Sequence, residues 1–202
     1  MKLWLVRHAQ PLINAGICYG RLDVAADAAA TAGCARKLAQ ALPAGISVVA
    51  SPLQRCEQLR QALHAERPDL IYKTDLRLQE MDFGRWEGCA WTTIDRAELQ
   101  AWTTDFADYA AGHEGESVTG FMARVGSAFD EVGSETLTPA LSQRAREAEL
   151  KPQSNVLWIT HAGVIRAAGL LAQGVRHIRH ARQWPLETLK YGQWQTLDLP
   201  TG

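Results

Sequence analysis

The ten residues ISVVASPLQR, at positions 46–55, run from a β-branched stretch directly into the start of a helix. Residues 46–51 are short and rich in Val and Ile, which is typical of a buried strand. The letters SPLQ (residues 51–54) then predict an N-cap serine, a proline at the first helical position and a capping-box glutamine. A strand that turns directly into a helix is typical of a parallel α/β sheet, and it places Arg55 in the first helical turn.

Other segments repeat this alternation. Strand character recurs at LWLVR (residues 3–7), LIYKT (70–74) and VLWIT (156–160), each expected to be buried or half-buried, and residues 192–199 alternate in the manner of an edge strand. Between them, residues 31–42 and 52–63 have apolar side chains at spacings of three and four, which is a helical pattern. We therefore predict an α/β fold: a three-layer α/β/α sandwich around a mainly parallel sheet.

Two segments differ from this alternation. Residues 85–125 carry several tryptophans and many acidic side chains, and they predict a small helical cap inserted over the edge of the sheet. The polar residues 135–154 predict an exposed helix and loop.

Composition sets the broad class of the protein. The 202 residues are 47% apolar and 21% charged, which is typical of one globular domain covering residues 1–202. The formal net charge of −1 argues against a polyanion-binding surface, so we expect no nucleic-acid partner. The apolar run before Arg7 is too short for a signal peptide's apolar region, and the longest uncharged stretch, residues 38–54, is broken by two prolines and a glycine, so we expect no membrane partner. The spacing of the four cysteines matches no metal motif and favours reduced thiols in a cytoplasmic protein. The sequence leaves the oligomeric state open between a monomer and a homodimer.

Basic side chains follow three of the predicted strands. Arg7 and His8 end the first strand, Arg55 follows the second, and His161 follows the strand at residues 156–160. Because ligands bind at the carboxyl ends of the strands in such sheets, these side chains should converge there. Taken alone, each also has a structural explanation. Their joint burial is unfavourable without an anion, and arginine binds phosphate in bidentate fashion, so the edge is predicted to be a phosphate pocket.

Such a pocket suggests a reaction. A neutral imidazole can attack phosphorus to form a phosphohistidine, while the cations neutralise the phosphoryl oxygens. The leaving alkoxide then needs a proton. Glu80 and Asp82, just beyond the third predicted strand, are the candidate acids.

These residues together resemble the histidine phosphatase, or phosphoglycerate mutase-like, superfamily. The resemblance covers most of the chain, and five stretches carry it in order: LVRHAQ (5–10), SPLQRCEQL (51–59), LQEMDFGRWEG (78–88), GES (115–117) and THAGVIRA (160–167). It implies a phosphoglycerate mutase-like fold and a metal-independent phosphatase without a cofactor. His8 would be the phosphorylated nucleophile, and Glu80 the general acid and then the base. The phosphate clamp would consist of Arg7, Arg55 and His161, and the expected substrate contacts are Asn14, Arg21 and Ala162.

The resemblance also bears on the substrate, a small phosphorylated metabolite. CYGRLDVA (18–25), together with EMDFGRWEG and GHEGES, looks most like the α-ribazole 5′-phosphate phosphatases of cobalamin assembly. Sugar-phosphate and nucleotide phosphatases share similar strings, and a phosphoglycerate mutase stays an alternative, although the chain lacks the long insertion of the cofactor-dependent mutases. The chain departs from the family at Ala9-Gln10-Pro11, where Gly-Glu-Thr is usual, and substrate contacts at that rim stay open.

Several features have two explanations. The tryptophans Trp86, Trp91 and Trp102 either stack on an aromatic base of the substrate or pack the cap. A basic patch is either a solvated helix face, which we favour, or a contact for an anionic substrate tail; it consists of His177, Arg179, His180 and Arg182.

Two other functions stay open. A metal phosphoesterase would use His8, His161, Glu80 and Asp82 as ligands, which the nearby arginines disfavour. A phosphate-binding protein without catalysis would use the same fold.

Overall fold

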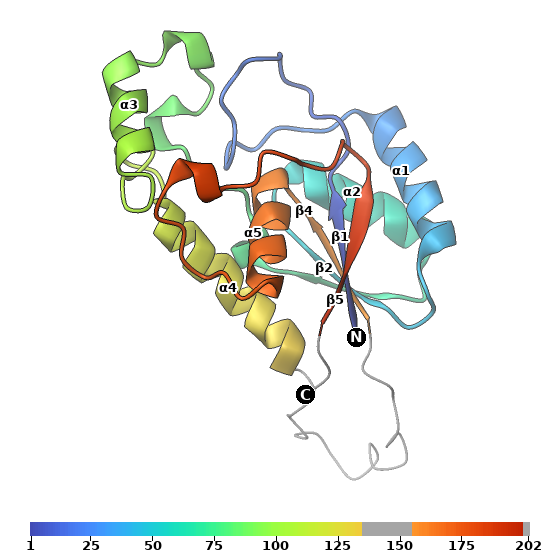
Figure 1. Ribbon diagram of the computed structural model, residues 1–202. Helices are drawn as coiled ribbons and strands as arrows, with labels where there is room; N and C mark the ends of the chain where they lie inside the picture. The colour runs from blue at the N-terminus through green and yellow to red at the C-terminus, as the bar shows by residue number, and fades with distance from the viewer. Residues whose placement is uncertain (135–154, 200–202) are drawn as a thin grey trace.

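The computed structural model describes residues 1–134 and 155–199, so the segment predicted as an exposed helix and loop lies outside it. Within the described residues, five strands form one sheet, in the order β3-β2-β4-β1-β5 (Figure 1). The strands are β1 (Lys2–Arg7), β2 (Ser47–Ala50), β3 (Ile71–Thr74), β4 (Val156–Thr160) and β5 (Trp194–Asp198). The first four are parallel, and β5 pairs antiparallel with β1 at the edge. The predicted mainly parallel sheet is confirmed.

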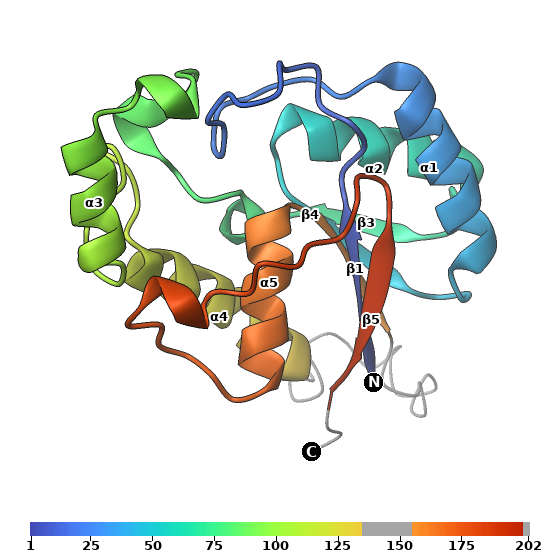
Figure 2. The same ribbon diagram turned by 45° about the horizontal axis from the view of Figure 1, so that its top comes forward.

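Helices cover both faces of this sheet, as the two views in Figures 1 and 2 show. On one face, α1 (Ala28–Ala41) and α2 (Gln54–Glu66) pack over inward-facing strand residues such as Val6 and Ile159. On the other face, α4 (Val118–Ser134) and α5 (Ala162–Ala172) pack over the alternate strand residues. The two faces follow from the period of two along each strand. The three-layer sandwich is confirmed.

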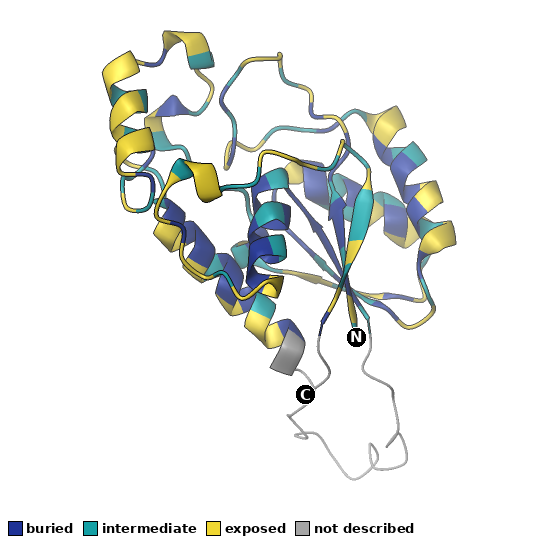
Figure 3. Ribbon diagram, in the orientation of Figure 1, coloured by how far each residue is buried: buried dark blue, intermediate teal, exposed yellow. Residues whose placement is uncertain are grey.

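Burial follows position in the sheet (Figure 3). The central strand β4 is buried at all five positions, whereas β3 is mostly exposed. The prediction of a buried or half-buried strand over residues 70–74 is therefore wrong for most of β3. Its residue types are those of a core strand, but among the described residues β3 has a neighbouring strand on one side only, and Ile71 is 65% exposed.

The start of α2 also differs from its prediction. The helix begins at Gln54, with Leu53 at the N-cap and no side-chain cap. The hydroxyl of Ser51 lies 2.8 Å from Nε2 of His161 instead of forming a capping box. The first-turn N–H of Gln54 donates to the carboxylate of Asp23, 2.6 Å away on a distant loop. Tertiary hydrogen bonds have thus replaced the local cap that the sequence predicts.

The predicted cap region contains two short turns, η2 (Gly84–Trp86) and η3 (Trp91–Thr93), and the helix α3 (Arg96–Thr104). Figure 1 shows α3 beyond the carboxyl ends of the strands, on the side of α4. The last residues of the predicted cap range belong to α4, which packs against the sheet. Among residues 1–134 and 155–199, no helix is both long and apolar enough to cross a membrane. All four cysteines are free.

Candidate active site

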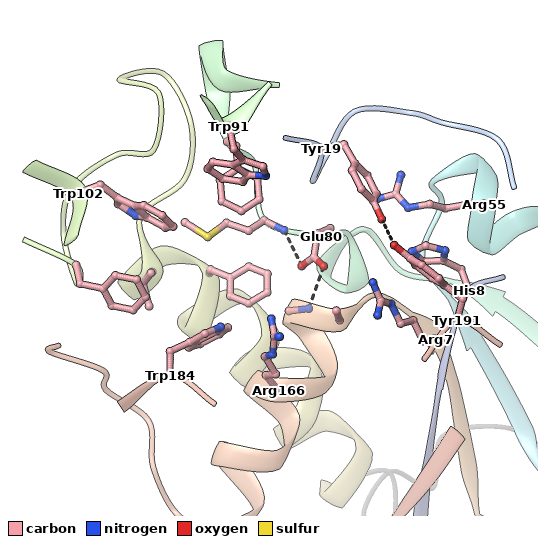
Figure 4. Close-up of a pocket in the computed structure, with 17 residues that line it drawn as sticks. Arg7, His8, Tyr19, Arg55, Glu80, Trp91, Trp102, Arg166, Trp184 and Tyr191 are labelled. Carbon is pink, nitrogen blue, oxygen red and sulfur yellow. Dashed lines mark hydrogen bonds between the residues drawn. The ribbon is translucent and has the colours of Figure 1, made fainter. Parts of the chain in front are cut away.

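A cavity of about 430 Å³ lies at the carboxyl ends of the parallel strands (Figure 4). One end is polar and is lined by Arg7, His8, Tyr19, Arg55, Glu80 and Tyr191. The other end is lined mainly by large apolar side chains: Met81, Phe83, Trp91, Trp102, Phe106, Val118, Phe121 and Trp184. The side chain of Arg166 from α5 lies between these two ends (Figure 4).

His8 stands directly after β1 and is only 2% exposed. Its Nδ1 lies 2.7 Å from the carbonyl oxygen of Ala9. A carbonyl oxygen can only accept a hydrogen bond, so Nδ1 carries the proton and Nε2 keeps its lone pair. Burial, with the charges of Arg55 and Arg7, lowers the pKa of His8 to about 3. The imidazole is therefore neutral at physiological pH and available as a nucleophile.

Arg55 is completely buried in the first turn of α2. Its guanidinium donates to the carbonyl of Leu22, at 2.8 Å, and to that of Gly20, and its Nε donates to Nδ1 of His161 at 3.2 Å. No ion pair joins it to a carboxylate in the described part of the chain. A buried cation held only by neutral groups favours an anionic ligand.

His161 follows β4 and is fully buried, with its ring centroid 5.2 Å from that of His8. Because its Nδ1 accepts from Arg55, its Nε2 carries the hydrogen and donates to Ser51. Burial, followed by the charge of Arg55, holds the pKa of His161 well below its usual value. His161 does not line the cavity but packs behind His8.

Arg7, the last residue of β1, points into the same polar end (Figure 4). Its Nη1 donates to the carbonyl of Leu189 at 2.7 Å, and its guanidinium carbon lies 3.9 Å from the centroid of the Tyr191 ring. Its Nε–H is buried and has no hydrogen-bond partner among the described residues. Arg7 and Arg55 together place two positive charges beside the neutral ring of His8, an arrangement suited to a phosphate.

Glu80 faces His8 across the cavity from the segment after η1 (Leu76–Leu78) (Figure 4). Its Oε2 accepts from the backbone N–H of Gly163 at 2.9 Å, and its Oε1 from that of Met81 at 3.1 Å. The guanidinium of Arg124 on α4 donates to the carbonyls of Gln79, at 2.9 Å, and of Glu80, at 3.4 Å. Hydrogen bonds thus fix both the side chain of Glu80 and the backbone that carries it.

Other expected site residues lie elsewhere. Asn14 is exposed and Arg21 pairs with Asp82 at 3.3 Å, and none of these three lines the cavity, whereas Ala162 does. The side chains of the basic patch are exposed and lie outside the cavity. In the described residues, no three His, Cys, Asp or Glu side chains are grouped so that they could hold a metal ion. The four ligands of the metal hypothesis therefore form no such group.

The tryptophans divide between the two explanations. Trp91 and Trp102 line the apolar end of the cavity, whereas Trp86 is buried in the cap, with its Nε1 donating to Glu98 at 2.7 Å. Sequence reasoning assigned no role to Tyr19, Tyr191, Arg166 or Trp184. Arg166 stands five residues after His161 in the THAGVIRA motif, and Tyr19 lies in CYGRLDVA, so two of them were within reach of motif reasoning.

Comparisons with known proteins identify the family of the chain. Residues 3–198 match the family model of the histidine phosphatase superfamily (branch 1). The chain belongs to that superfamily. No curated protein matches the sequence. The expected family and fold are thus confirmed, and so is the expected enzyme class, a phosphatase, with support from a solved phosphatase of similar structure.

Solved structures resemble the whole chain. Mycobacterial glucosyl-3-phosphoglycerate phosphatase is 25% identical, with a TM-score of 0.73, over 96% of this chain and 88% of that one. Its complex with inorganic phosphate has a TM-score of 0.72 at 25% identity, over 98% of this chain and 89% of that one. TTHB049 from Thermus thermophilus is 27% identical, with a TM-score of 0.64, over 99% of this chain and 95% of that one. Neither the family nor these structures points to α-ribazole phosphate.

Proposed function

We propose that this superfamily member is a phosphomonoesterase that hydrolyses a small phosphorylated metabolite through a phosphohistidine on His8, without a metal. The observation that carries the proposal is the neutral His8, with Nε2 unprotonated, beside the buried Arg55 and the half-buried Arg7, neither of which has a carboxylate partner among the described residues. Nε2 attacks phosphorus and the ester P–O bond breaks, while protonated Glu80 gives its proton to the leaving oxygen. Water then attacks phosphorus, the P–N bond to His8 breaks, Glu80 takes a proton from the water, and phosphate leaves. Arg7 and Arg55 neutralise the phosphoryl oxygens in both steps.

The test is to trap the intermediate. Wild-type protein mixed with a labelled phosphomonoester and quenched in base should carry acid-labile phosphate, and His8→Ala should carry none and turn over no substrate. His64→Ala, which removes an exposed histidine of α2, is the matched control and should behave like wild type. Turnover retained in His8→Ala would contradict the mechanism. Loss of activity on chelation with EDTA would favour a metal phosphoesterase, and absence of labelling by any substrate a binding protein.

For the leaving group, we propose α-ribazole 5′-phosphate. Its flat benzimidazole base suits the apolar end of the cavity, where the aromatic faces of Trp91, Trp102 and Trp184 gather (Figure 4). The volume of about 430 Å³ is in the range of small-molecule sites. The four free cysteines are consistent with the cytoplasmic location that we propose for this reaction.

A sugar-phosphate phosphatase is the second candidate, and its support is the similarity to mycobacterial glucosyl-3-phosphoglycerate phosphatase. Ribose 5-phosphate separates the two, because it matches α-ribazole 5′-phosphate without the base. Stacking of a base on an aromatic side chain is worth about 1–3 kcal/mol, so kcat/KM should favour the ribazole ester by about fivefold or more. Trp102→Ala should remove much of that preference. Equal values for the two esters, or preference for phosphoglycerate with mutase turnover, would contradict the substrate proposal.

A further inference from the structure

Two tyrosines close the polar end of the cavity, and the mechanism above gives them no role. Tyr19 lies on the loop between β1 and α1, and Tyr191 on the turn before β5, 172 positions away in the sequence. Their hydroxyl oxygens are 2.8 Å apart and share a hydrogen bond. Figure 4 shows this pair beside His8 and Arg55, and the ring centroids of His8 and Tyr191 are 5.6 Å apart.

Each tyrosine ring also lies near one of the two arginines of the phosphate pocket. The guanidinium carbon of Arg7 is 3.9 Å from the Tyr191 ring centroid, and that of Arg55 is 5.4 Å from the Tyr19 ring centroid. Contacts of a cation with an aromatic face help to hold both groups in place. The two hydroxyl groups are therefore held at the same end of the cavity as the two positive charges.

The hydrogen bond between the two tyrosines uses only one of their two hydroxyl hydrogens. Each phenol has one O–H, so when one hydroxyl donates to the other, the accepting hydroxyl keeps its own hydrogen. Neither hydroxyl makes another hydrogen bond among the described residues. Burial, followed by the hydrogen bond with Tyr191, raises the pKa of Tyr19, which keeps this phenol protonated. The pair thus offers one neutral O–H donor, whichever tyrosine accepts.

The rim of the pocket has fewer side-chain donors where the chain departs from its family. Ala9-Gln10-Pro11 follows the Arg-His pair, so no hydroxyl stands there. Ala9 and Pro11 are buried, and the amide of Gln10 lies 3.5 Å from the carbonyl of Pro11. Residues 9–11 do not line the cavity, whereas the tyrosine pair lines its polar end and can supply a neutral donor there.

We propose that Tyr19 and Tyr191 form a shared donor of the phosphate site, whose free O–H binds a phosphoryl oxygen alongside Arg7 and Arg55. This inference rests on the proposed function, because it takes the ligand to be the phosphoryl group held at His8. Either tyrosine alone still has an O–H that can donate to the phosphate. Removal of both hydroxyls should therefore weaken binding more than either single change.

The experiment measures the affinities of orthovanadate and of inorganic phosphate by calorimetry for Tyr19→Phe, Tyr191→Phe and the double variant. Phenylalanine keeps both rings against the arginines and removes only the hydroxyls. Tyr72→Phe is one control, because that hydroxyl donates to the carbonyl of Arg67, the C-cap of α2, at the end of the helix opposite Arg55. Cys34→Ala is the second control, because the Cys34 thiol donates to the carbonyl of Gly192, next to Tyr191. It loosens the same turn without removing a tyrosine hydroxyl.

The double variant should bind vanadate on the order of tenfold or more weakly, the loss expected for a hydrogen bond to a charged group, and each single variant should lose less. Both controls should bind as wild type does. Unchanged or tighter binding by the double variant would overturn the proposal, as would an equal loss in Cys34→Ala. If the affinity loss is found but His8 is never phosphorylated, the donor role stands and the proposed reaction fails. A wild-type protein that binds neither anion overturns both.

Discussion

Replacement of Gly163 by alanine should displace the proposed proton donor while leaving the fold intact. Gly163 is the second residue of α5, and its N–H donates to Oε2 of Glu80. A Cβ at this position would lie 2.2 Å from Oε1 and 3.0 Å from Cδ of Glu80. Unstrained carbon–oxygen contacts are about 3.3 Å or longer, so the carboxyl group must move by about 1 Å. It can move, because it is the end of a flexible side chain.

The expected loss follows from this displacement. A shift of about 1 Å in a reacting group costs roughly 10²-fold in rate, so kcat/KM for an alkyl phosphate should fall by about that factor. Stability should not fall with it. Gly163 does not have a left-handed backbone, and alanine in a helix is favoured over glycine by about 0.5–1 kcal/mol, which offsets the cost of moving the carboxyl group.

The assay compares an alkyl phosphate with p-nitrophenyl phosphate. Nitrophenolate leaves without a proton, so its kcat/KM should fall much less in Gly163→Ala. The matched control is Gly169→Ala, on the same helix, where a Cβ would meet no atom within 4 Å. In a Glu80→Ala background, Gly163→Ala should have little further effect, because the group that it displaces is absent.

Three results would refute this reasoning. Wild-type kcat/KM of Gly163→Ala on the alkyl ester would mean that the carboxyl position does not matter. Equal losses on the two esters would mean that Glu80 does not protonate the leaving group. A full additional loss in the Glu80→Ala background would place the effect of Gly163→Ala on another group.

Acidification should destabilise the protein as the pH falls from 6.5 towards 3, because there the unfolded chain binds a proton at His8 that the folded chain excludes. The slope is about 1.4 kcal/mol per pH unit for one such proton, and thermal unfolding of His8→Gln should show a flatter pH dependence than wild type. Arg124→Met should lower the free energy of unfolding in urea by about 1–3 kcal/mol, because it leaves the backbone carbonyls of Arg77 and Gln79 unpaired. Arg176→Met removes an exposed ion pair and should lower it by only about 0–1 kcal/mol. Equal costs would contradict this ranking. Glu87→Gln should speed hydrogen exchange in the loop around Tyr19, because the carboxylate accepts from four backbone N–H groups and an amide has only one accepting oxygen; unchanged exchange would disprove that anchoring role.

Four residues of the site could be brought together from the sequence pattern. Arg7, His8, Arg55 and His161 follow strands that prove to be parallel and adjacent, so their convergence needed only the strand pattern and the rule for strand ends. Local rules failed at Ser51, because a tertiary hydrogen bond to His161 competes with the helix cap.

The apolar end of the cavity shows a second limit. Phe83, Trp102, Phe106, Phe121 and Trp184 line it from segments that share no motif. Each of these side chains is apolar. From the sequence alone, a position in the hydrophobic core explains it as well as a position in the cavity wall. Only their arrangement around the cavity shows that these side chains form a wall against which a ligand can lie.

The sequence by itself determined the layered α/β fold, the superfamily and the basic side chains at the strand ends, because strand and helix periods and strand-end positions are properties of local sequence. Only the tertiary structure decided that Tyr19 meets Tyr191, that the start of α5 holds Glu80, and that Arg21 pairs with Asp82 away from the cavity. These contacts join loops that are far apart in the chain. Their geometry depends on how the packed layers bring the loops together, and no local sequence pattern specifies which loops meet.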